Sequence, residues 1–447
     1  MAKRKPSARQ IAVNILEQVH KKGHHADALI SDSFGKQTLK QEDKSLVLEL
    51  VNGTLRWRGL LDWILTDYFQ GDFKSCHARL KSILELSLYQ LKFLNKIPEY
   101  AAVSQGVAIA KKHGGKAWGN LVNGVLRSYL REEKSLEFPS FEIDPVSALA
   151  VRYSHPRWMV QRWLNRFGLE EAKQLCQFNN RRPMISLRVN LQKTSVEALL
   201  KTFEKYGIRA ELSEYFSDFI KISKPQDLTQ LPPFNEGLFS VQDESTAIAC
   251  LLLAPEKGET VLDLCAAPGG KAGYLAQLME DTGIVLAVDS NPQRMNLVKQ
   301  NTRRLRLRSV VPIIANGTVF SLGKPVDKVL LDAPCSGLGV LAKRADLRWK
   351  RQLQDIYELK KLQKSLIQNA GNLVRKGGVL VYSTCTIEPE ENEEVVEDFL
   401  GEHKDFELDH DSNLLNKVFM NSRGYWTTLS HKCKMDGTFS ARMVKVK

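Results

Sequence analysis

The sequence predicts a multidomain protein with an all-α N-terminal bundle, a small α/β insert and a C-terminal α/β domain on a doubly wound parallel sheet. Apolar residues recur at helical spacing up to about residue 138. The pattern changes to strand-like alternation at residues 185–189. From Val261 onward, short apolar runs alternate with helical segments, as in parallel βαβ units. These changes predict domains at 1–138, 145–240 and 241–447.

Length, composition and charge limit the class of protein. A chain of 447 residues has room for several domains and an ample core. No apolar run approaches the ~18 residues that cross a bilayer, so we expect no membrane partner. Seven cysteines without a C-x-x-C pair argue against zinc and against a disulfide scaffold, and they predict a reducing, cytoplasmic location without a bound metal. The net charge of +13 favours a polyanionic partner.

The N-terminal region reads as helices only. Leucine and valine stripes within residues 46–55 and 80–91 have the spacing of helix core positions. The sequence VNGTLR at 51–56 is echoed by VNGVLR at 122–127, which indicates pseudo-symmetry inside one bundle. We interpret His20, His24 and His25 as surface residues, because Gly23 breaks their helical spacing.

The sequence pattern changes twice in the middle of the chain. Residues 132–145 are charged and contain proline, which predicts a linker before further helices up to about residue 179. A strand at 185–189, a helix at 195–206 and short apolar stretches near 219–220 and 238–239 then predict the small α/β insert.

The C-terminal region alternates strands with helices. A helix is expected to end near Leu400, and a turn at Asp436-Gly437 leads into a final strand. The predicted parallel strands are 261–264, 284–288, 310–314, 328–331 and 379–382.

A glycine-rich loop follows the first of these strands. Residues 265–271 join a strand to a helix N-terminus, where free backbone N–H groups face the ligand crevice of an open sheet. The spacing fits neither an NTPase phosphate loop, since Cys265 and Ala272 occupy its diagnostic positions, nor the dinucleotide fingerprint. Asp289 ends the next strand, at an offset suited to a ribose diol. S-adenosylmethionine, which has a ribose but no pyrophosphate, fits best.

Two cysteines end neighbouring segments of the predicted sheet. Asp332-Ala333-Pro334-Cys335 follows the fourth strand, and Cys385 follows the fifth. A lone free cysteine is more often a small core residue. Two thiols at one sheet edge, one of them three residues after an acid, favour nucleophilic catalysis instead.

Such thiols suit methylation at carbon 5 of a pyrimidine. Addition of a thiolate to carbon 6 makes carbon 5 enamine-like and able to accept a methyl group from a sulfonium. An acid must hydrogen-bond the ring nitrogen, and a base must then remove the carbon-5 proton so that the thiolate can leave.

The motifs VQDESTA, LDLCAAPGGK, LDAPCSG and YSTCT resemble those of RNA (cytosine-5) methyltransferases. The N-terminal helices resemble the NusB-like RNA-binding domain, so the resemblance covers the whole chain and points to the members that methylate 16S (small-subunit) ribosomal RNA. It implies a Rossmann-like S-adenosylmethionine-dependent methyltransferase domain whose sheet ends in an antiparallel hairpin.

The resemblance also implies roles for individual residues. Cys385 is the expected nucleophile, Cys335 assists product release, and Asp332 holds the cytosine edge. Asn316 stands where the family often has aspartate, so its contact to adenine departs from the family pattern. The expected cofactor contacts are Cys265, Ala266, Ala267, Pro268, Gly269, Gly270, Lys271, Asp289, Asn316 and Asp332.

Basic residues around Trp349 place charge beside a stacking surface, which favours RNA contact. We expect a monomer acting on ribosomal RNA. The alternatives are another RNA such as tRNA, or a non-catalytic RNA-binding assembly factor. DNA cytosine methyltransferases and amino-group methyltransferases fit the motifs less well. The predicted RNA-binding residues are Lys343, Arg344, Arg348, Lys350 and Arg351.

Overall fold

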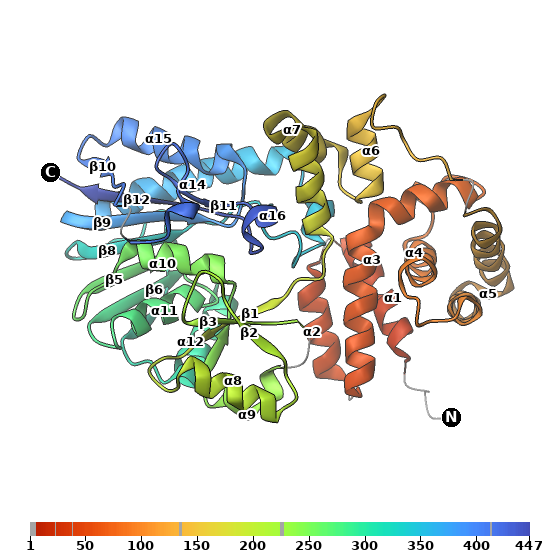
Figure 1. The fold of residues 1–447 in the computed structure, drawn as a ribbon, viewed down its shortest axis with the longest axis horizontal. Helices are drawn as coiled ribbons and strands as arrows, with labels where there is room; N and C mark the ends of the chain where they lie inside the picture. Colours follow the sequence, from red (N-terminus) through yellow and green to blue (C-terminus); the bar gives the residue numbers. More distant parts are fainter. Residues whose placement is uncertain (1–5, 23, 38, 134–135, 224–227, 412–413) are drawn as a thin grey trace. The chain divides into compact units, whose positions relative to one another are not determined.

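The computed structural model describes residues 6–22, 24–37, 39–133, 136–223, 228–411 and 414–447, and the chain divides into two compact units (Figure 1). The first unit comprises Met1–Arg181 and Leu341–Lys350. The second comprises Arg182–Val340 and Arg351–Lys447. The sequence does not predict that Leu341–Lys350, from the C-terminal half of the chain, belongs to the first unit.

The first unit is helical, which confirms the predicted N-terminal bundle. Its long helix α5 contains a kink at Gly114 and Gly115, where Gly115 has a φ of 67°. Asp144 caps α6 by accepting the Ser147 amide, and Pro145 occupies the first turn. The helices are α1 (Ala8–Lys22), α2 (Ala26–Lys36), α3 (Gln41–Tyr68), α4 (Ala78–Phe93), α5 (Glu99–Glu132), α6 (Pro145–Arg152), α7 (Arg157–Asn179) and the short α13 (Leu347–Lys350).

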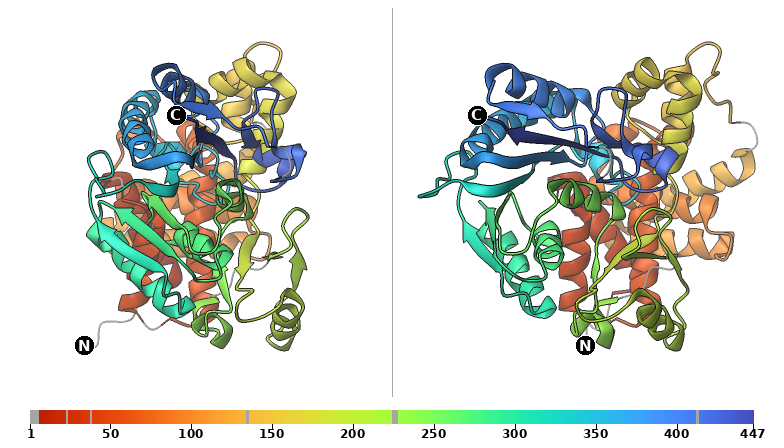
Figure 2. Two further views of the ribbon diagram at one scale, coloured as in Figure 1. Left: turned by 90° about the vertical axis from the view of Figure 1, so that its left-hand side faces the viewer. Right: turned by 60° about the vertical axis from the view of Figure 1, so that its left-hand side comes forward.

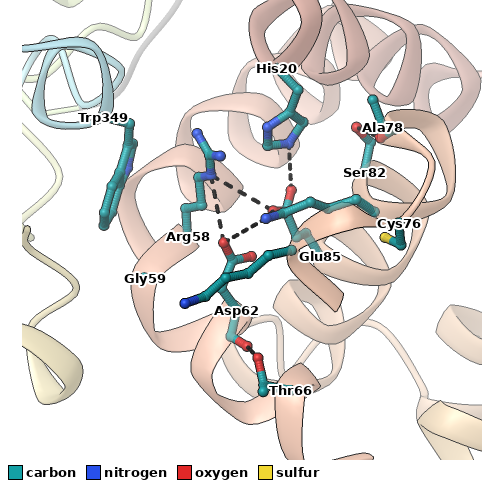
Figure 3. Close-up of polar contacts among 12 residues, drawn as sticks. His20, Arg58, Gly59, Asp62, Thr66, Cys76, Ala78, Ser82, Glu85 and Trp349 are labelled. Atoms are coloured by element: carbon teal, nitrogen blue, oxygen red, sulfur yellow. Dashed lines mark hydrogen bonds and ion pairs between the residues drawn. The ribbon is translucent and has the colours of Figure 1, made fainter. Parts of the chain in front are cut away.

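A cluster of charged side chains lies among α1, α3 and α4 (Figure 3). The side chain of His20 is only 5% exposed, and its Nε2 lies 2.8 Å from a Glu85 oxygen, so the interpretation of His20 as a surface residue was wrong. Lys81 Nζ lies 2.9 Å from an Asp62 oxygen, and Arg58 lies 3.8 Å from both carboxylates. Burial, and then the charge of Glu85, raise the pKa of Asp62 to about 8. The Asp62 carboxyl therefore keeps its proton at pH values at which an ordinary carboxyl group is ionised.

The second unit begins with a four-stranded antiparallel sheet in the order β2-β3-β1-β4. Ser195 caps the helix that packs on it by accepting the Ala198 amide. This sheet confirms the predicted α/β insert. Its elements are β1 (Ile185–Val189), α8 (Val196–Lys205), β2 (Ala210–Leu212), β3 (Phe219–Ile222), α9 (Pro232–Asn235) and β4 (Phe239–Val241).

The larger sheet has the order β10-β12-β9-β8-β5-β6-β7, with β11 paired to β12. Its strands are β5 (Thr260–Leu264), β6 (Ile284–Asp289), β7 (Val310–Ile314), β8 (Val326–Asp332), β9 (Val374–Thr384), β10 (Phe406–Leu408), β11 (Trp426–Thr428) and β12 (Thr438–Lys445). The strands from β9 to β7 are parallel, and β12 is antiparallel to β9. The predicted parallel sheet with its final antiparallel strand is therefore confirmed.

Helices cover both faces of this sheet (Figure 1 and Figure 2). One face packs against α10 (Ala247–Leu253), α11 (Gly270–Leu278) and α12 (Pro292–Leu305), and the other against α14 (Leu353–Leu373) and α15 (Glu393–Glu402). Burial of both faces explains why the strands read as continuous apolar runs. The short helix α16 (Ser430–Cys433) precedes β12. Within the described ranges, no helix is long and apolar enough to span a membrane.

The raised pKa of Asp62 predicts how the free energy of unfolding depends on pH. Asp62 keeps in the folded state a proton that it gives up when unfolded, where its pKa is about 4. The free energy of unfolding should therefore fall as pH rises from about 4 to about 8. Asp62→Asn removes this dependence, because the amide does not titrate. The melting temperature of Asp62→Asn relative to wild type should thus increase between pH 5 and pH 8. Asp67→Asn, an exposed change on the same helix, should show a constant difference.

Candidate active site

The glycine-rich loop lies between β5 and α11, as the sequence predicts. Gly269 has a φ of 96°, and a Cβ atom there would lie 3.1 Å from the Val298 Cα of α12. The loop therefore requires glycine at this point. Ala266 N–H donates to the Val288 carbonyl at 2.8 Å, which ties the loop to the end of β6.

Asp289 supports this loop from the end of β6. One carboxylate oxygen accepts the Ala267 N–H at 3.1 Å, and the other accepts the Asn291 N–H at 2.9 Å. The side chain is buried, and Arg294 lies at 4.0 Å. Each carboxylate oxygen can accept more than one hydrogen bond, so Asp289 has capacity left for hydroxyl donors.

Lys271 and Asp332 form an ion pair beside the loop, with 2.7 Å between Nζ and Oδ2. Burial alone would lower the pKa of Lys271, but the charge and the hydrogen bond of Asp332 outweigh it and raise this pKa. Asp263, at the end of β5, is fully buried. Burial, followed by the nearby charge of Asp332, raises the pKa of Asp263 well above its ordinary value.

The two thiols meet at the carboxyl ends of β8 and β9. The Sγ atoms of Cys335 and Cys385 are 3.2 Å apart, and the Cys385 N–H donates to the Cys335 Sγ at 3.3 Å. The hydrogen bond to Cys385, and then burial, raise the pKa of Cys335 well above its ordinary value. Cys335 therefore keeps its proton at neutral pH. Its S–H group can donate a hydrogen bond to the sulfur of Cys385.

Neighbouring side chains hold the loop that carries Cys335. Glu391 accepts the Ser336 N–H at 2.8 Å, and Gln363 donates to the Pro334 carbonyl at 2.8 Å and to Glu391 at 3.0 Å. The hydroxyls of Ser336 and Thr386 are 2.8 Å apart, which joins the two cysteine loops. The sequence does not single out Gln363, because nothing in its helical spacing distinguishes it.

A cavity of about 390 Å³ brings most of the predicted site together. It also includes residues that the sequence did not single out, such as Arg294 and Leu366. Ala266, Pro268, Gly269 and Gly270 shape the loop without being among the lining residues. The lining residues are Thr246, Cys265, Ala267, Lys271, Val288, Asp289, Ser290, Arg294, Asn316, Gly317, Thr318, Asp332, Ala333, Pro334, Cys335, Leu362, Leu366 and Cys385.

Asn316 lies in this lining, but its Oδ1 accepts hydrogen bonds from within its own turn. The Thr318 N–H and hydroxyl donate to it at 3.1 and 3.0 Å. The amide nitrogen of Asn316 is thus the atom more available to a ligand in this conformation.

The predicted RNA-binding residues do not line the cavity. Arg348 is fully buried, and its guanidinium donates to protein carbonyls. Lys350 pairs with Asp346 at 2.7 Å, and Arg351 donates to the Cys335 and Ser336 carbonyls. Arg344 is exposed, with Asp27 at 3.6 Å.

A parallel sheet with an antiparallel last strand, bearing a loop, an acid and two thiols at one edge, defines the class of α/β methyltransferases. Residues 250–444 match the family 16S rRNA methyltransferase RsmB/F, residues 155–229 its ferredoxin-like domain, and residues 6–131 the NusB family. The chain belongs to the RsmB/F family of methyltransferases. The family resemblance noted from the motifs is thereby confirmed.

Relatives match over the whole chain. The probable ribosomal RNA small subunit methyltransferase B of Bacillus subtilis is 36% identical and covers 99% of both chains. The corresponding protein of Cronobacter sakazakii is 31% identical over 99% of this chain and 100% of its own. The crystal structure of PH0851 is 27% identical, with a TM-score of 0.81 over 99% of this chain and 100% of that one. NSun6 from Pyrococcus horikoshii, solved with SFG, is 25% identical, with a TM-score of 0.59 over 65% and 98%.

The support of the Cys335 loop can be tested at Glu391. Glu391→Ala leaves the buried Ser336 N–H without its acceptor, which should lower the free energy of unfolding by ~1–3 kcal/mol. Chemical denaturation measures this change. Glu358→Ala, on the exposed face of α14, is the matched control and should stay near wild type. Equal stability of the two variants would contradict the role given to Glu391.

Proposed function

We propose that this protein transfers a methyl group from S-adenosylmethionine to carbon 5 of a cytosine in 16S (small-subunit) ribosomal RNA, through a covalent adduct with Cys385. The observation that carries the proposal is the pair of thiols, 3.2 Å apart, in the cavity that Asp332 and the glycine-rich loop also line. One thiol is needed to activate the ring and another group to release it. The names of the relatives support the RNA.

The thiols take different roles in this scheme. The Cys385 thiolate forms a bond to carbon 6, and the ring electrons then allow carbon 5 to take the methyl group. Once Cys385 is bonded to carbon 6, the hydrogen bond that raises the pKa of Cys335 is lost, so Cys335 can release its proton to water. The Cys335 thiolate then takes the carbon-5 proton, the carbon–hydrogen electron pair restores the ring double bond, and the sulfur–carbon bond breaks to release the Cys385 thiolate. Asp332, which Lys271 holds in place, binds the cytosine edge: the carboxylate accepts from the exocyclic amino group, and the protonated form donates to the ring nitrogen as negative charge develops there.

The cavity suits S-adenosylmethionine. Asp289 has acceptor capacity for ribose hydroxyls, Asn316 can meet the adenine edge, and the loop at 265–271 presents backbone N–H groups. The methyl donor carries a cationic sulfonium, which the acids at the strand ends attract. NSun6, which shares this fold, was solved with SFG, an S-adenosylmethionine analogue.

RNA contact outside the cavity is assigned to basic residues that are at least partly exposed. Among the basic residues near Trp349, Arg344 is exposed and Lys343 is half-buried. We retain these two as phosphate contacts. The charge of +13 is consistent with RNA binding. Because both thiols and Asp332 line one cavity, we favour methylation of RNA over a non-catalytic assembly role.

The cofactor assignment predicts a loss of affinity. Asp289→Ala removes the acceptor for two ribose hydroxyls and should weaken S-adenosylmethionine binding by ~1.5–3 kcal/mol, the value of a hydrogen bond to a charged group. Isothermal titration calorimetry measures it, with Glu358→Ala as a control of equal charge change. Unchanged affinity in Asp289→Ala would remove Asp289 from the cofactor site.

The thiol assignment predicts which variant traps RNA. Cys335→Ala should still methylate but not release its product, so a slow-migrating protein–RNA species should appear on a denaturing gel. Cys385→Ala and the double variant should form no such species, because the attacking sulfur is absent. Cys76→Ala, in the helical unit, should behave as wild type.

The reverse outcome is equally clear. An adduct that persists in Cys385→Ala and disappears in Cys335→Ala would make Cys335 the nucleophile. Bisulfite sequencing of ribosomal RNA from cells with and without the protein identifies the modified base. If no cytosine changes, the proposed reaction is refuted.

A further inference from the structure

The motif VQDESTA, at residues 241–247, borders the cavity without taking part in the chemistry of the thiols. Thr246 of this motif lines the cavity, and Gln242 is half-buried beside it. Both polar atoms of the Gln242 amide are bonded. Its Oε1 lies 2.6 Å from the Arg188 Nη1, and its Nε2 lies 2.7 Å from the Thr246 Oγ1. The motif thus links an arginine of β1 to a side chain in the cavity, within the second compact unit.

Arg188 sets the direction of these hydrogen bonds. A guanidinium only donates, so the amide oxygen of Gln242 faces Arg188 and the amide nitrogen faces Thr246. The guanidinium is itself held in place. Arg188 is 1% exposed, lies 4.3 Å from the centroid of the Tyr274 ring, and donates to the Gly270 carbonyl at 3.0 Å. Gly270 ends the loop that follows β5, so Arg188 joins the amide to this loop as well.

The hydroxyl of Thr246 is left as an acceptor. Its oxygen accepts the amide hydrogen of Gln242, and its own hydrogen is donated to the Asp243 carbonyl at 2.6 Å. A hydroxyl has one hydrogen and two lone pairs, so one lone pair remains for a further bond. In this arrangement Thr246 can accept a hydrogen bond from a ligand in the cavity but cannot donate one.

The order of the strands indicates which ligand group would meet Thr246. In the sheet order β5-β6-β7, the glycine-rich loop follows β5, Asp289 ends β6 and Asn316 follows β7. The proposed function assigns the ribose to Asp289 and the adenine to Asn316, so the side of β5 remains for the methionine part. Thr246 is joined to the loop on that side. Of the charged groups at the end of the methionine part, the ammonium donates hydrogen bonds and the carboxylate only accepts them.

We propose that Thr246 accepts a hydrogen bond from the ammonium group of S-adenosylmethionine, and that Arg188 and Gln242 are positioning residues that keep its hydroxyl oriented as an acceptor. The identity of the ligand rests on the proposed function. The direction of the hydrogen bonds does not, because it follows from which groups of these residues can donate.

The amino group of the ligand provides the test. S-adenosylhomocysteine carries this group, and in its deamino analogue a hydrogen atom replaces it. Thr246→Val keeps the shape of the side chain but removes the acceptor, so the affinity for S-adenosylhomocysteine should fall about tenfold, the effect of losing one hydrogen bond to a charged group. The affinity for the deamino analogue should not change. Isothermal titration calorimetry measures both affinities.

Three further variants separate the hydrogen bond from the fold of the cavity. Thr246→Ser retains the hydroxyl and should bind S-adenosylhomocysteine as the wild type does. Gln242→Met removes the amide at nearly constant length, and it should weaken binding of S-adenosylhomocysteine several-fold without affecting the deamino analogue. Thr202→Val removes a hydroxyl of α8 that donates to the Ala198 carbonyl, and this matched control should bind both ligands as the wild type does.

The outcomes distinguish this inference from the proposed function. Loss of affinity for both ligands in Thr246→Val, or for neither, would overturn the ammonium contact. Unchanged binding in Gln242→Met would overturn the positioning role. A wild type that binds S-adenosylhomocysteine no more tightly than the deamino analogue refutes the inference alone. If the wild type binds neither S-adenosylmethionine nor S-adenosylhomocysteine, the cofactor assignment of the proposed function fails, and the ammonium contact fails with it.

Discussion

The parallel register of β8 and β9 is the constraint on which the site depends. Asp332 is paired with Ser383, and the Ala333 N–H donates to the Ser383 carbonyl at 2.8 Å. Both strands thus end at one level, and each loop carries its cysteine within three residues of that pair. The 3.2 Å sulfur–sulfur distance follows from this register. A shift of one residue in either strand would direct the loops differently.

Acidic side chains at the strand ends determine the electrostatic character of the cavity. Asp263, Asp289 and Asp332 end three neighbouring strands of the sheet, β6-β5-β8, and Lys271 pairs with the last. Burial, followed by the nearby charge of Asp332, raises the pKa of Asp263 well above its ordinary value. The same arrangement favours a positively charged ligand in the cavity over an uncharged one.

The fold was predictable where pattern and packing agree. The strands of the large sheet are apolar because both faces are covered, and their polar ends mark the site, so Cys335, Cys385, Asp289 and Lys271 could be found from the sequence. The support from Gln363 could not, because a glutamine on a helix has the same pattern whether or not it meets a buried loop. His20 was misread because its partner, Glu85, lies 65 residues away.

The basic residues around Trp349 show a different limit. Arginines beside an aromatic ring have the composition of an RNA-binding surface, and also that of a buried anchor. Composition does not reveal whether a guanidinium faces phosphates or backbone carbonyls. Arg348 donates to the backbone carbonyl of Arg56 and to the side-chain amide oxygen of Asn180. These residues lie 292 and 168 positions away from it in the sequence.

The discontinuity of the helical unit also has a consequence for the order in which the protein matures during translation. Residues up to Arg181 leave the ribosome long before Leu341–Lys350, although both belong to one compact unit. The helical unit therefore stays incomplete, without Arg348 and Trp349, until most of the second unit has been synthesised. The N-terminal helical unit can thus be completed only after the loop that carries Cys335 has left the ribosome. A polypeptide truncated before residue 341 lacks the last piece of both units.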